Sequence, residues 1–176
     1  MRKFACTRCR NPLYFDNSAC LKCGAPVGFD PAEMRLVALS DHGSGSYRKI
    51  TRGGGLTRYC ANAAHGVCNW LTANHFNGEL CAACQLNRTI PNLSEPGNVD
   101  SWRDLENAKR RLVYSLLRFR LPMDGGGSAI GPLAFDFVRS YYAPVVSLDW
   151  AHVNGLFDAM EREGREALAR AGVREA

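Results

Sequence analysis

The sequence predicts an α+β fold in which a small β-rich zinc ribbon and a second four-cysteine zinc module precede amphipathic helices. Eight cysteines fall into two clusters in the first half of the chain, and helical periodicity begins only after them. With 176 residues, the chain has the usual size of one domain or of two small units. We expect a zinc ribbon over residues 1–40, a second zinc module over residues 41–98 and a helical region over residues 99–176.

The first cluster consists of two Cys-x-x-Cys pairs, formed by Cys6, Cys9, Cys20 and Cys23. Two residues between ligands allow one tight turn to aim both sulfurs at one ion. Short apolar segments at residues 3–5, 13–15 and 35–39 are expected to form the surrounding strands. Four thiolates complete a tetrahedral shell that leaves no place for water, so the predicted site is structural. Iron uses the same ligands in rubredoxin-like sites, and zinc is the favoured metal.

The second cluster is spread more widely before its one Cys-x-x-Cys pair, and it consists of Cys60, Cys68, Cys81 and Cys84. His65 and His75 lie within it and could replace a sulfur. Four sulfurs are favoured because they use every remaining cysteine of the chain. We therefore expect two zinc ions per chain.

Glycines and helical periodicity organise the rest of the chain. Residues 41–58 contain five glycines and are expected to be a flexible connector. A helix is predicted over about residues 101–121, where Ser101 and Asp104 resemble a capping box. A second amphipathic helix is predicted over about residues 148–171. Between the two helices, the sequence is compatible with either a strand or a short helix.

The first predicted helix has apolar residues at spacings of three and four. We expect these residues to pack inward: Trp102, Leu105, Ala108, Leu112, Leu116 and Phe119. Its basic residues are expected to form a solvated face rather than a nucleic-acid stripe: Arg103, Lys109, Arg110, Arg111 and Arg118.

The positive charge lies mainly in the cysteine-rich half of the chain. The formal net charge is +5, and the first 99 residues carry 11 Lys and Arg against 6 Asp and Glu. Possible nucleic-acid contacts are Arg48, Lys49, Arg52 and Arg58, with Tyr47 and Tyr59 available for stacking. A modest net charge is also common in ordinary proteins. Nucleic acid is therefore an alternative to a protein partner whose identity the sequence leaves unknown.

The ends and apolar stretches of the sequence predict where the protein resides. No apolar stretch approaches the roughly 18 residues of a spanning helix, so we expect no membrane partner. The N-terminus is charged and already lies within a metal motif, which is not typical of a secretory signal. We therefore expect a cytoplasmic location, where reduced thiols favour metal binding over disulfides.

The sequence contains no complete catalytic template. It has no HExxH motif, no phosphate loop and no nucleophile elbow, and none of its four histidines are spaced four residues apart. Catalysis is therefore not expected from these residue patterns.

Several segments together carry a resemblance to a family: FACTRC, LYFDNSACLKCGAPVGFDP, RYCANAAHGVCNWL, CAACQLNRTIPNLS, WRDLENAKRRLVYSLLRFRLP and LAFDF. Over about residues 1–138 the chain resembles the N-terminal part of bacterial zinc-ribbon proteins classed as zinc-binding metallopeptidases. The resemblance implies a zinc ribbon, a second cysteine cluster, a helix and then a peptidase-like domain with HExxH. It also implies that Cys6, Cys9, Cys20 and Cys23 are the ribbon ligands, and it places the other four cysteines on family cysteines.

After residue 137 the chain departs from the expected pattern and supplies no HExxH helix. We therefore expect a non-catalytic zinc-binding protein, a shortened relative of the metallopeptidases that acts as a binding or scaffold module. Two alternatives stay open: a nucleic-acid-binding zinc-ribbon protein, and a fragment of a split or interrupted metallopeptidase.

Overall fold

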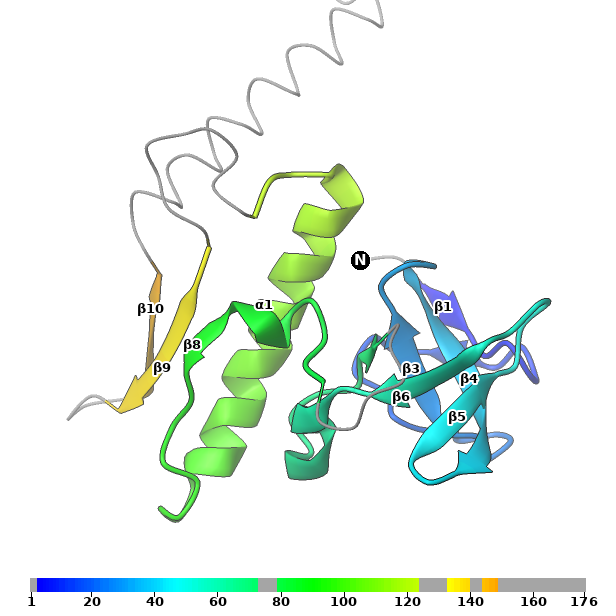
Figure 1. Cartoon of the computed structure of the whole chain (residues 1–176), viewed down its shortest axis with the longest axis horizontal. Helices are drawn as coiled ribbons and strands as arrows, with labels where there is room; N and C mark the ends of the chain where they lie inside the picture. The colour runs from blue at the N-terminus through cyan, green and yellow to red at the C-terminus, as the bar shows by residue number, and fades with distance from the viewer. Residues whose placement is uncertain (1–2, 73–78, 124–132, 140–143, 149–176) are drawn as a thin grey trace, which may run out of the picture.

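The computed structural model describes residues 3–72, 79–123, 133–139 and 144–148. A cysteine-rich β region comes first, one long helix follows, and two further strands lie beyond it (Figure 1). The strands before the helix are β1 (Phe4–Ala5), β2 (Pro12–Leu13), β3 (Val27–Asp30), β4 (Arg35–Gly43), β5 (Ser46–Lys49), β6 (Leu56–Tyr59), β7 (Leu71–Thr72) and β8 (Asn87–Thr89). The other elements are the short 3₁₀ helices η1 (Ala61–His65) and η2 (Cys84–Leu86), the helix α1 (Asn98–Phe119), and the strands β9 (Phe135–Arg139) and β10 (Pro144–Leu148).

Strands β3 to β7 form a five-stranded antiparallel sheet in which each strand pairs with the next along the chain. A backbone bridge also links Phe29 of β3 to Trp70, just before β7. Gly28 lies at this contact, and a Cβ there would be 2.4 Å from Cδ2 of Leu71. The absence of a side chain at Gly28 therefore lets the first and last strands of the sheet meet.

Residues 41–58, expected to be a flexible connector, instead continue this sheet as β5 and β6. The turn between β4 and β5 passes through Gly43, Ser44 and Gly45, whose φ angles of 85°, 53° and 71° are all positive. Gly53, with φ of 74°, lies in the next turn. The glycines therefore serve hairpin turns, where positive φ is required, and the strands between them are short and mostly polar.

An aromatic core joins the β1–β2 hairpin, the five-stranded sheet and α1. The rings of Phe29 and Trp70 have centroids 4.6 Å apart, and those of Phe15 and Phe29 are 5.2 Å apart. Tyr114 of α1 packs edge-on against Phe15 at 5.4 Å. Such pairs add about 0.5–1.5 kcal/mol each beyond the area that they bury, so this core fixes α1 against the sheet.

Helix α1 begins three residues before its predicted start. Gly97, with φ of 81°, precedes the helix, and the N–H of Ser101 donates to the carbonyl oxygen of Gly97. Ser101 therefore lies within the first turn, and the predicted capping box is wrong because no side chain caps this end. The helix ends at Phe119, where Arg120 adopts a left-handed conformation with φ of 56°.

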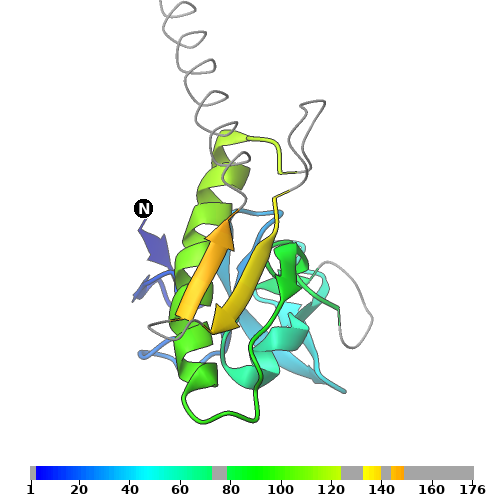
Figure 2. The same cartoon turned by 90° about the vertical axis from the view of Figure 1, so that its left-hand side faces the viewer.

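A second sheet covers the other side of α1. Strands β8 and β9 pair in parallel with α1 as the crossover between them, and β10 pairs antiparallel with β9. Figure 1 shows α1 between this sheet and the five-stranded sheet, and Figure 2 shows β9 and β10 in front of α1. The segment that the sequence left open between strand and helix thus contains a strand.

Helix α1 is buried on two sides, and its predicted faces are partly wrong. Leu112 is 38% exposed and Phe119 57% exposed, although both were expected to pack inward. The buried residues of the helix are Trp102, Glu106, Lys109, Arg110, Val113, Tyr114 and Leu116. Lys109 and Arg110 are therefore not solvated. A single apolar stripe describes a helix with one buried face, whereas α1 contacts a sheet on each side.

The α+β class and the two four-cysteine clusters are confirmed, but the residues that the structure describes contain one long helix rather than several. The predicted second helix lies outside these residues apart from Leu148, which ends β10. Among the helices that can be described, none combines the length and the apolar composition needed to cross a membrane.

Alanine variants of two aromatic residues of α1, one buried and one exposed, test which side chains of the helix are buried. Replacing Tyr114, which is 3% exposed, by alanine is expected to lower the free energy of unfolding by about 3–5 kcal/mol, because it removes a buried ring from the core. Phe119→Ala is the matched control, because Phe119 lies on the same helix but is exposed. It should change the free energy of unfolding by less than about 0.5 kcal/mol. Urea denaturation of the metal-loaded variants measures both, and equal losses would contradict the burial pattern.

Candidate metal centres

Two equivalent backbone turns present the first cysteine cluster. In one turn the N–H of Arg10 donates to the carbonyl oxygen of Cys6 at 2.9 Å, and in the other the N–H of Gly24 donates to that of Cys20 at 2.8 Å. Arg10 and Gly24 have nearly the same left-handed φ, 67° and 68°. This conformation is free for glycine but costs about 1–2 kcal/mol for another residue. The same local geometry therefore aims two sulfurs from each turn.

The four sulfurs of the first cluster have the spacing of a tetrahedral metal site. All four Sγ atoms lie within 4.8 Å of one another, with Cys9 and Cys20 3.6 Å apart and Cys6 and Cys23 3.8 Å apart. A tetrahedron with metal–sulfur bonds of about 2.3 Å has sulfurs about 3.8 Å apart. All eight cysteines are free. The donor set therefore fits one ion bound by four thiolates.

The pKa values of two thiols in the first cluster are shifted in opposite directions. The backbone N–H of Cys23 lowers the pKa of Cys20 to about 6, although burial acts in the opposite direction. The backbone of Asn11 acts to lower the pKa of Cys9, but burial and hydrogen bonds with the other thiols raise it to about 12. Metal binding requires thiolates, so an ion would displace the remaining protons.

The second cluster draws its cysteines from three segments and is fully buried. Cys60 follows β6, Cys68 precedes β7, and Cys81 and Cys84 lie before and at the start of η2. Their Sγ atoms also lie within 4.8 Å of one another, with 3.7 Å between Cys68 and Cys81. The N–H of Trp70 donates to Sγ of Cys68, and that of Cys81 to Sγ of Cys60, each at 3.4 Å. These N–H groups favour thiolates at the buried site.

The pKa values of the four thiols in the second cluster are shifted in opposite directions. Hydrogen bonds from Cys68, Cys81 and Cys84 lower the pKa of Cys60. Hydrogen bonding with Cys60, together with burial, raises the pKa of the other three thiols.

The ligand group that the structure describes at this second site contains sulfur alone. His65 is exposed at the end of η1, and its ring lies 5.9 Å from that of Trp102 rather than among the sulfurs. His75 lies outside the described residues. The geometry thus supports four-sulfur ligation over a site in which His65 replaces a cysteine.

A buried ion pair on α1 touches the second cluster. Sγ of Cys84 lies 3.1 Å from Oε1 of Glu106, and Nζ of Lys109 donates to the same oxygen at 2.6 Å. Lys109 also donates to Oδ1 of Asn87 in β8 and lies 5.5 and 5.6 Å from two aromatic rings of β9. Glu106 and Lys109 are almost fully buried. The pair thus joins the cysteine cluster to α1, β8 and β9.

The contact between Cys84 and Glu106 bears on how this cluster would hold a metal. Sγ of Cys84 donates to Oε1 of Glu106. A Cys84 that ligates a metal as a thiolate would have no proton to donate, so its negative charge would lie beside the carboxylate. Lys109, which pairs with Glu106, would then supply positive charge beside the site, because four thiolates around a divalent ion carry a net charge of −2.

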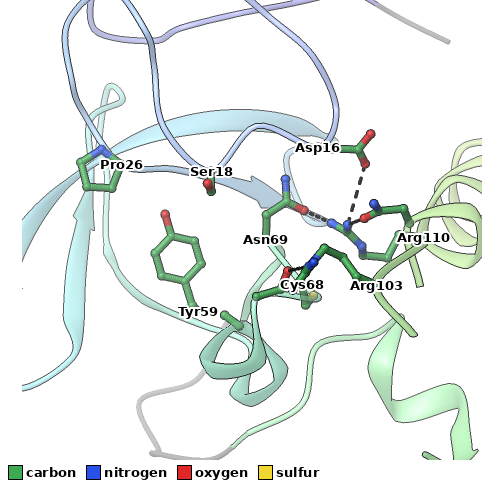
Figure 3. A pocket seen from close by; sticks show the side chains of 11 residues that line it. Asp16, Ser18, Pro26, Tyr59, Cys68, Asn69, Arg103 and Arg110 are labelled. Carbon is green, nitrogen blue, oxygen red and sulfur yellow. Dashed lines mark hydrogen bonds and ion pairs between the residues drawn. The ribbon is translucent and has the colours of Figure 1, made fainter. Parts of the chain in front are cut away.

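A crevice of about 420 Å³ opens beside the second cluster, where the first cluster's loop, the five-stranded sheet and α1 meet (Figure 3). Cys68 lies in its wall. The guanidinium of Arg110 donates to the side chains of Asn69 and Asn107, and Asp16 lies 3.8 Å from it. These contacts hold α1 against the loop that carries Cys68.

The four basic residues expected to contact nucleic acid do not form one free surface. Arg48 and Arg52 are exposed. Lys49 pairs with Asp30 at 2.7 Å and with a second carboxylate at 3.4 Å. Arg58 donates to a backbone oxygen of the turn between β4 and β5 at 2.6 Å. Two of the four side chains therefore already serve contacts within the sheet.

The two tyrosines expected to stack on bases contact each other instead. The rings of Tyr47 and Tyr59 pack edge-on with centroids 5.2 Å apart. The hydroxyl of Tyr59 donates to the carbonyl oxygen of Val27 at 3.0 Å, and burial raises the pKa of Tyr59. Tyr59 therefore links β6 to β3.

Sequence reasoning missed Glu106, Lys109 and Asn87. The first two are three residues apart on a helix, which is the spacing of an ordinary surface ion pair. Only the contact of Glu106 with Cys84, which lies 22 residues earlier, and the pairing of Lys109 with Glu106 make them part of the second centre. No pattern within the helix signals that contact.

Three curated mycobacterial proteins are similar to this chain. They are the uncharacterized proteins Mb2598c of Mycobacterium bovis and MT2644 and Rv2568c of Mycobacterium tuberculosis. Each is 32% identical over 165 residues, which cover 93% of this chain but 44% of the relative. The chain thus spans less than half the length of these relatives. No solved structure matches it.

A family model of a zinc-ribbon domain matches residues 3–95, which is more than half of the chain. The matched range contains all eight cysteines and therefore both clusters. The match and the geometry of the two clusters together show that the chain belongs to the zinc-ribbon domain family.

Proposed function

We propose that the chain is a non-catalytic zinc module in which two zinc ions close the two four-cysteine sites, and that it acts as a binding or scaffold unit. The observation that carries the proposal is the second cluster, whose four sulfurs are buried and bonded through Cys84 to α1. A site with four protein ligands has no open position for water or substrate. Four thiolates also make the ion a weaker Lewis acid.

Zinc is the proposed metal at both sites. The sulfur spacing suits a tetrahedral ion, which is the geometry that zinc adopts with four thiolates. Iron binds the same ligands, and the match to a zinc-ribbon family favours zinc. The grouping of all eight cysteines into two sets of metal ligands is typical of a reducing compartment such as the cytoplasm.

We further propose that this chain corresponds to the N-terminal zinc-binding part of proteins classed as zinc-binding metallopeptidases. The metal-ligand groups found in the described residues are sulfur-only, so we assign no peptidase chemistry to them. Any catalytic groups of the longer relatives would belong to the part that this chain does not match. A fragment of a split or interrupted metallopeptidase stays the alternative.

The zinc content of the purified chain tests the proposal most simply. We expect two zinc ions per chain by elemental analysis, and unfolding when a strong chelator removes both, because structural zinc contributes folding free energy. His65→Ala is the matched control within the second cluster and should retain both ions. A content of one ion, or loss of one ion in His65→Ala, would contradict sulfur-only ligation at the second site.

The buried ion pair of Glu106 and Lys109 predicts that mutations of these two residues have non-additive effects on stability and on zinc retention at the second cluster. Lys109→Met leaves the buried carboxylate of Glu106 beside a thiolate, so we expect a loss of about 3–5 kcal/mol in stability and faster loss of one zinc to a chelator. The double variant Glu106→Gln with Lys109→Met removes both charges and should recover part of that loss. Urea denaturation and competition with a chelating dye measure both effects. A double variant no better than Lys109→Met would contradict this role of the pair.

The alternative function is nucleic-acid binding. It rests on Arg48 and Arg52, which are the exposed members of the four predicted contact residues. If it holds, binding of single-stranded RNA should weaken steeply with salt, and Arg48→Ala with Arg52→Ala should make that dependence shallower. Fluorescence anisotropy at several salt concentrations measures the slope. The alternative fails if the chain does not bind RNA at low salt.

A further inference from the structure

The two cysteine clusters differ in how far solvent reaches their sulfurs. In the first cluster Cys9 and Cys23 are partly exposed, whereas Cys6 and Cys20 are buried. In the second cluster all four residues are buried, namely Cys60, Cys68, Cys81 and Cys84. A reagent dissolved in water therefore meets the thiolates of the first cluster before those of the second.

Each exposed sulfur of the first cluster faces a buried sulfur from the other turn. Cys9 lies 3.6 Å from Cys20, and Cys23 lies 3.8 Å from Cys6. An oxidised cysteine condenses with a nearby thiol to form a disulfide. Both exposed cysteines thus have a resolving partner within reach, and that partner is itself shielded from the oxidant.

Basic residues adjoin the two exposed cysteines. Arg8 and Arg10 flank Cys9, and Lys22 precedes Cys23; all three basic residues are exposed. None of them makes an ion pair within the part of the chain that the structure describes. Reactive cysteines lie in partly exposed, electropositive surroundings of this kind. The second cluster differs, since the cation beside Cys84 is buried and already paired with Glu106.

We propose that the first cluster is a redox-labile zinc site that responds to hydrogen peroxide, while the second cluster is an inert anchor. This inference rests on the two zinc sites of the proposed function and adds a difference in reactivity between them. In the reaction, the thiolate sulfur of Cys9 or Cys23 attacks one peroxide oxygen. The S–O bond forms as the O–O bond breaks, and hydroxide leaves and is protonated to water.

The buried partner then completes the reaction. Its thiolate sulfur attacks the sulfenic sulfur, the S–S bond forms, and hydroxide leaves and takes a proton to become water. In total, two thiolates, one hydrogen peroxide and two protons give one disulfide and two water molecules. The first disulfide removes two of the four thiolates that would hold the zinc, so the site would no longer retain it. A thiol reductant and zinc reverse the change.

The test uses the zinc-loaded full chain, with its zinc content measured first. On addition of hydrogen peroxide, a chelating dye should report release of one zinc per chain at least about ten times faster than the second. Blocking free thiols and mapping peptides after this first phase should find Cys9 joined to Cys20, Cys6 joined to Cys23, or both. The fluorescence of Trp70 and Trp102, which are buried around the second cluster and α1, should change little.

A matched pair of charge variants separates reactivity from folding. Arg8→Gln with Arg10→Gln should slow the fast phase several-fold at unchanged zinc content, because it removes the cations beside Cys9. Arg48→Gln with Arg52→Gln removes the same charge from exposed positions outside the cluster and should leave the rate unchanged. Equal slowing by both pairs would overturn the role of the flanking residues.

The remaining outcomes decide between the two proposals. With two zinc ions at the start, release of both at one rate, or disulfides formed first among the cysteines of the second cluster, would overturn the redox asymmetry while leaving structural zinc intact. A starting content of one zinc per chain would contradict the proposed function, and this inference with it.

Discussion

The four buried sulfurs of the second cluster lie within 4.8 Å of one another, and the position of several elements follows from that constraint. Cys60 and Cys68 join the end of β6 to the start of β7, and Cys81 and Cys84 direct the chain into η2 and β8. Cys84 then contacts Glu106 on α1. The second cluster thus connects the five-stranded sheet to the helix and to the sheet on its far side.

Two tetrathiolate centres, as proposed for the cysteine clusters, would place negative charge near polar groups that are unusual in a protein core. Charged residues are rarely buried without a partner, yet α1 buries Glu106, Lys109 and Arg110. Lys109 and Arg110 are the buried cations nearest in the chain to Glu106, and Arg110 binds the side chain of Asn69, next to Cys68. At the first cluster the cations lie at the surface instead. One centre is therefore enclosed by the fold, and the other stays in contact with solvent.

The sequence predicts best what local spacing determines. The Cys-x-x-Cys pairs identify the first cluster and half of the second, because each such turn is built from neighbouring residues. Cys60 and Cys68 were assigned as the remaining cysteines, and the long helix follows from its periodicity. Local patterns do not reveal which sides of a helix become buried, so Leu112 and Phe119 were expected inside and Lys109 outside. They also missed β5 and β6, whose pairing depends on β4. Glu106 could not be found, because its role arises from a contact with a cysteine 22 residues away.

A structural role for both centres requires that sulfur alone closes each of them. X-ray absorption at the zinc edge of the loaded chain measures this directly, since it reports the type, number and distance of the atoms bound to the metal. We predict four sulfurs per zinc at about 2.3 Å, with no nitrogen or oxygen ligand. An average of fewer than four sulfurs, with a nitrogen or oxygen at about 2.0–2.1 Å, would show an open or mixed site and contradict the structural role.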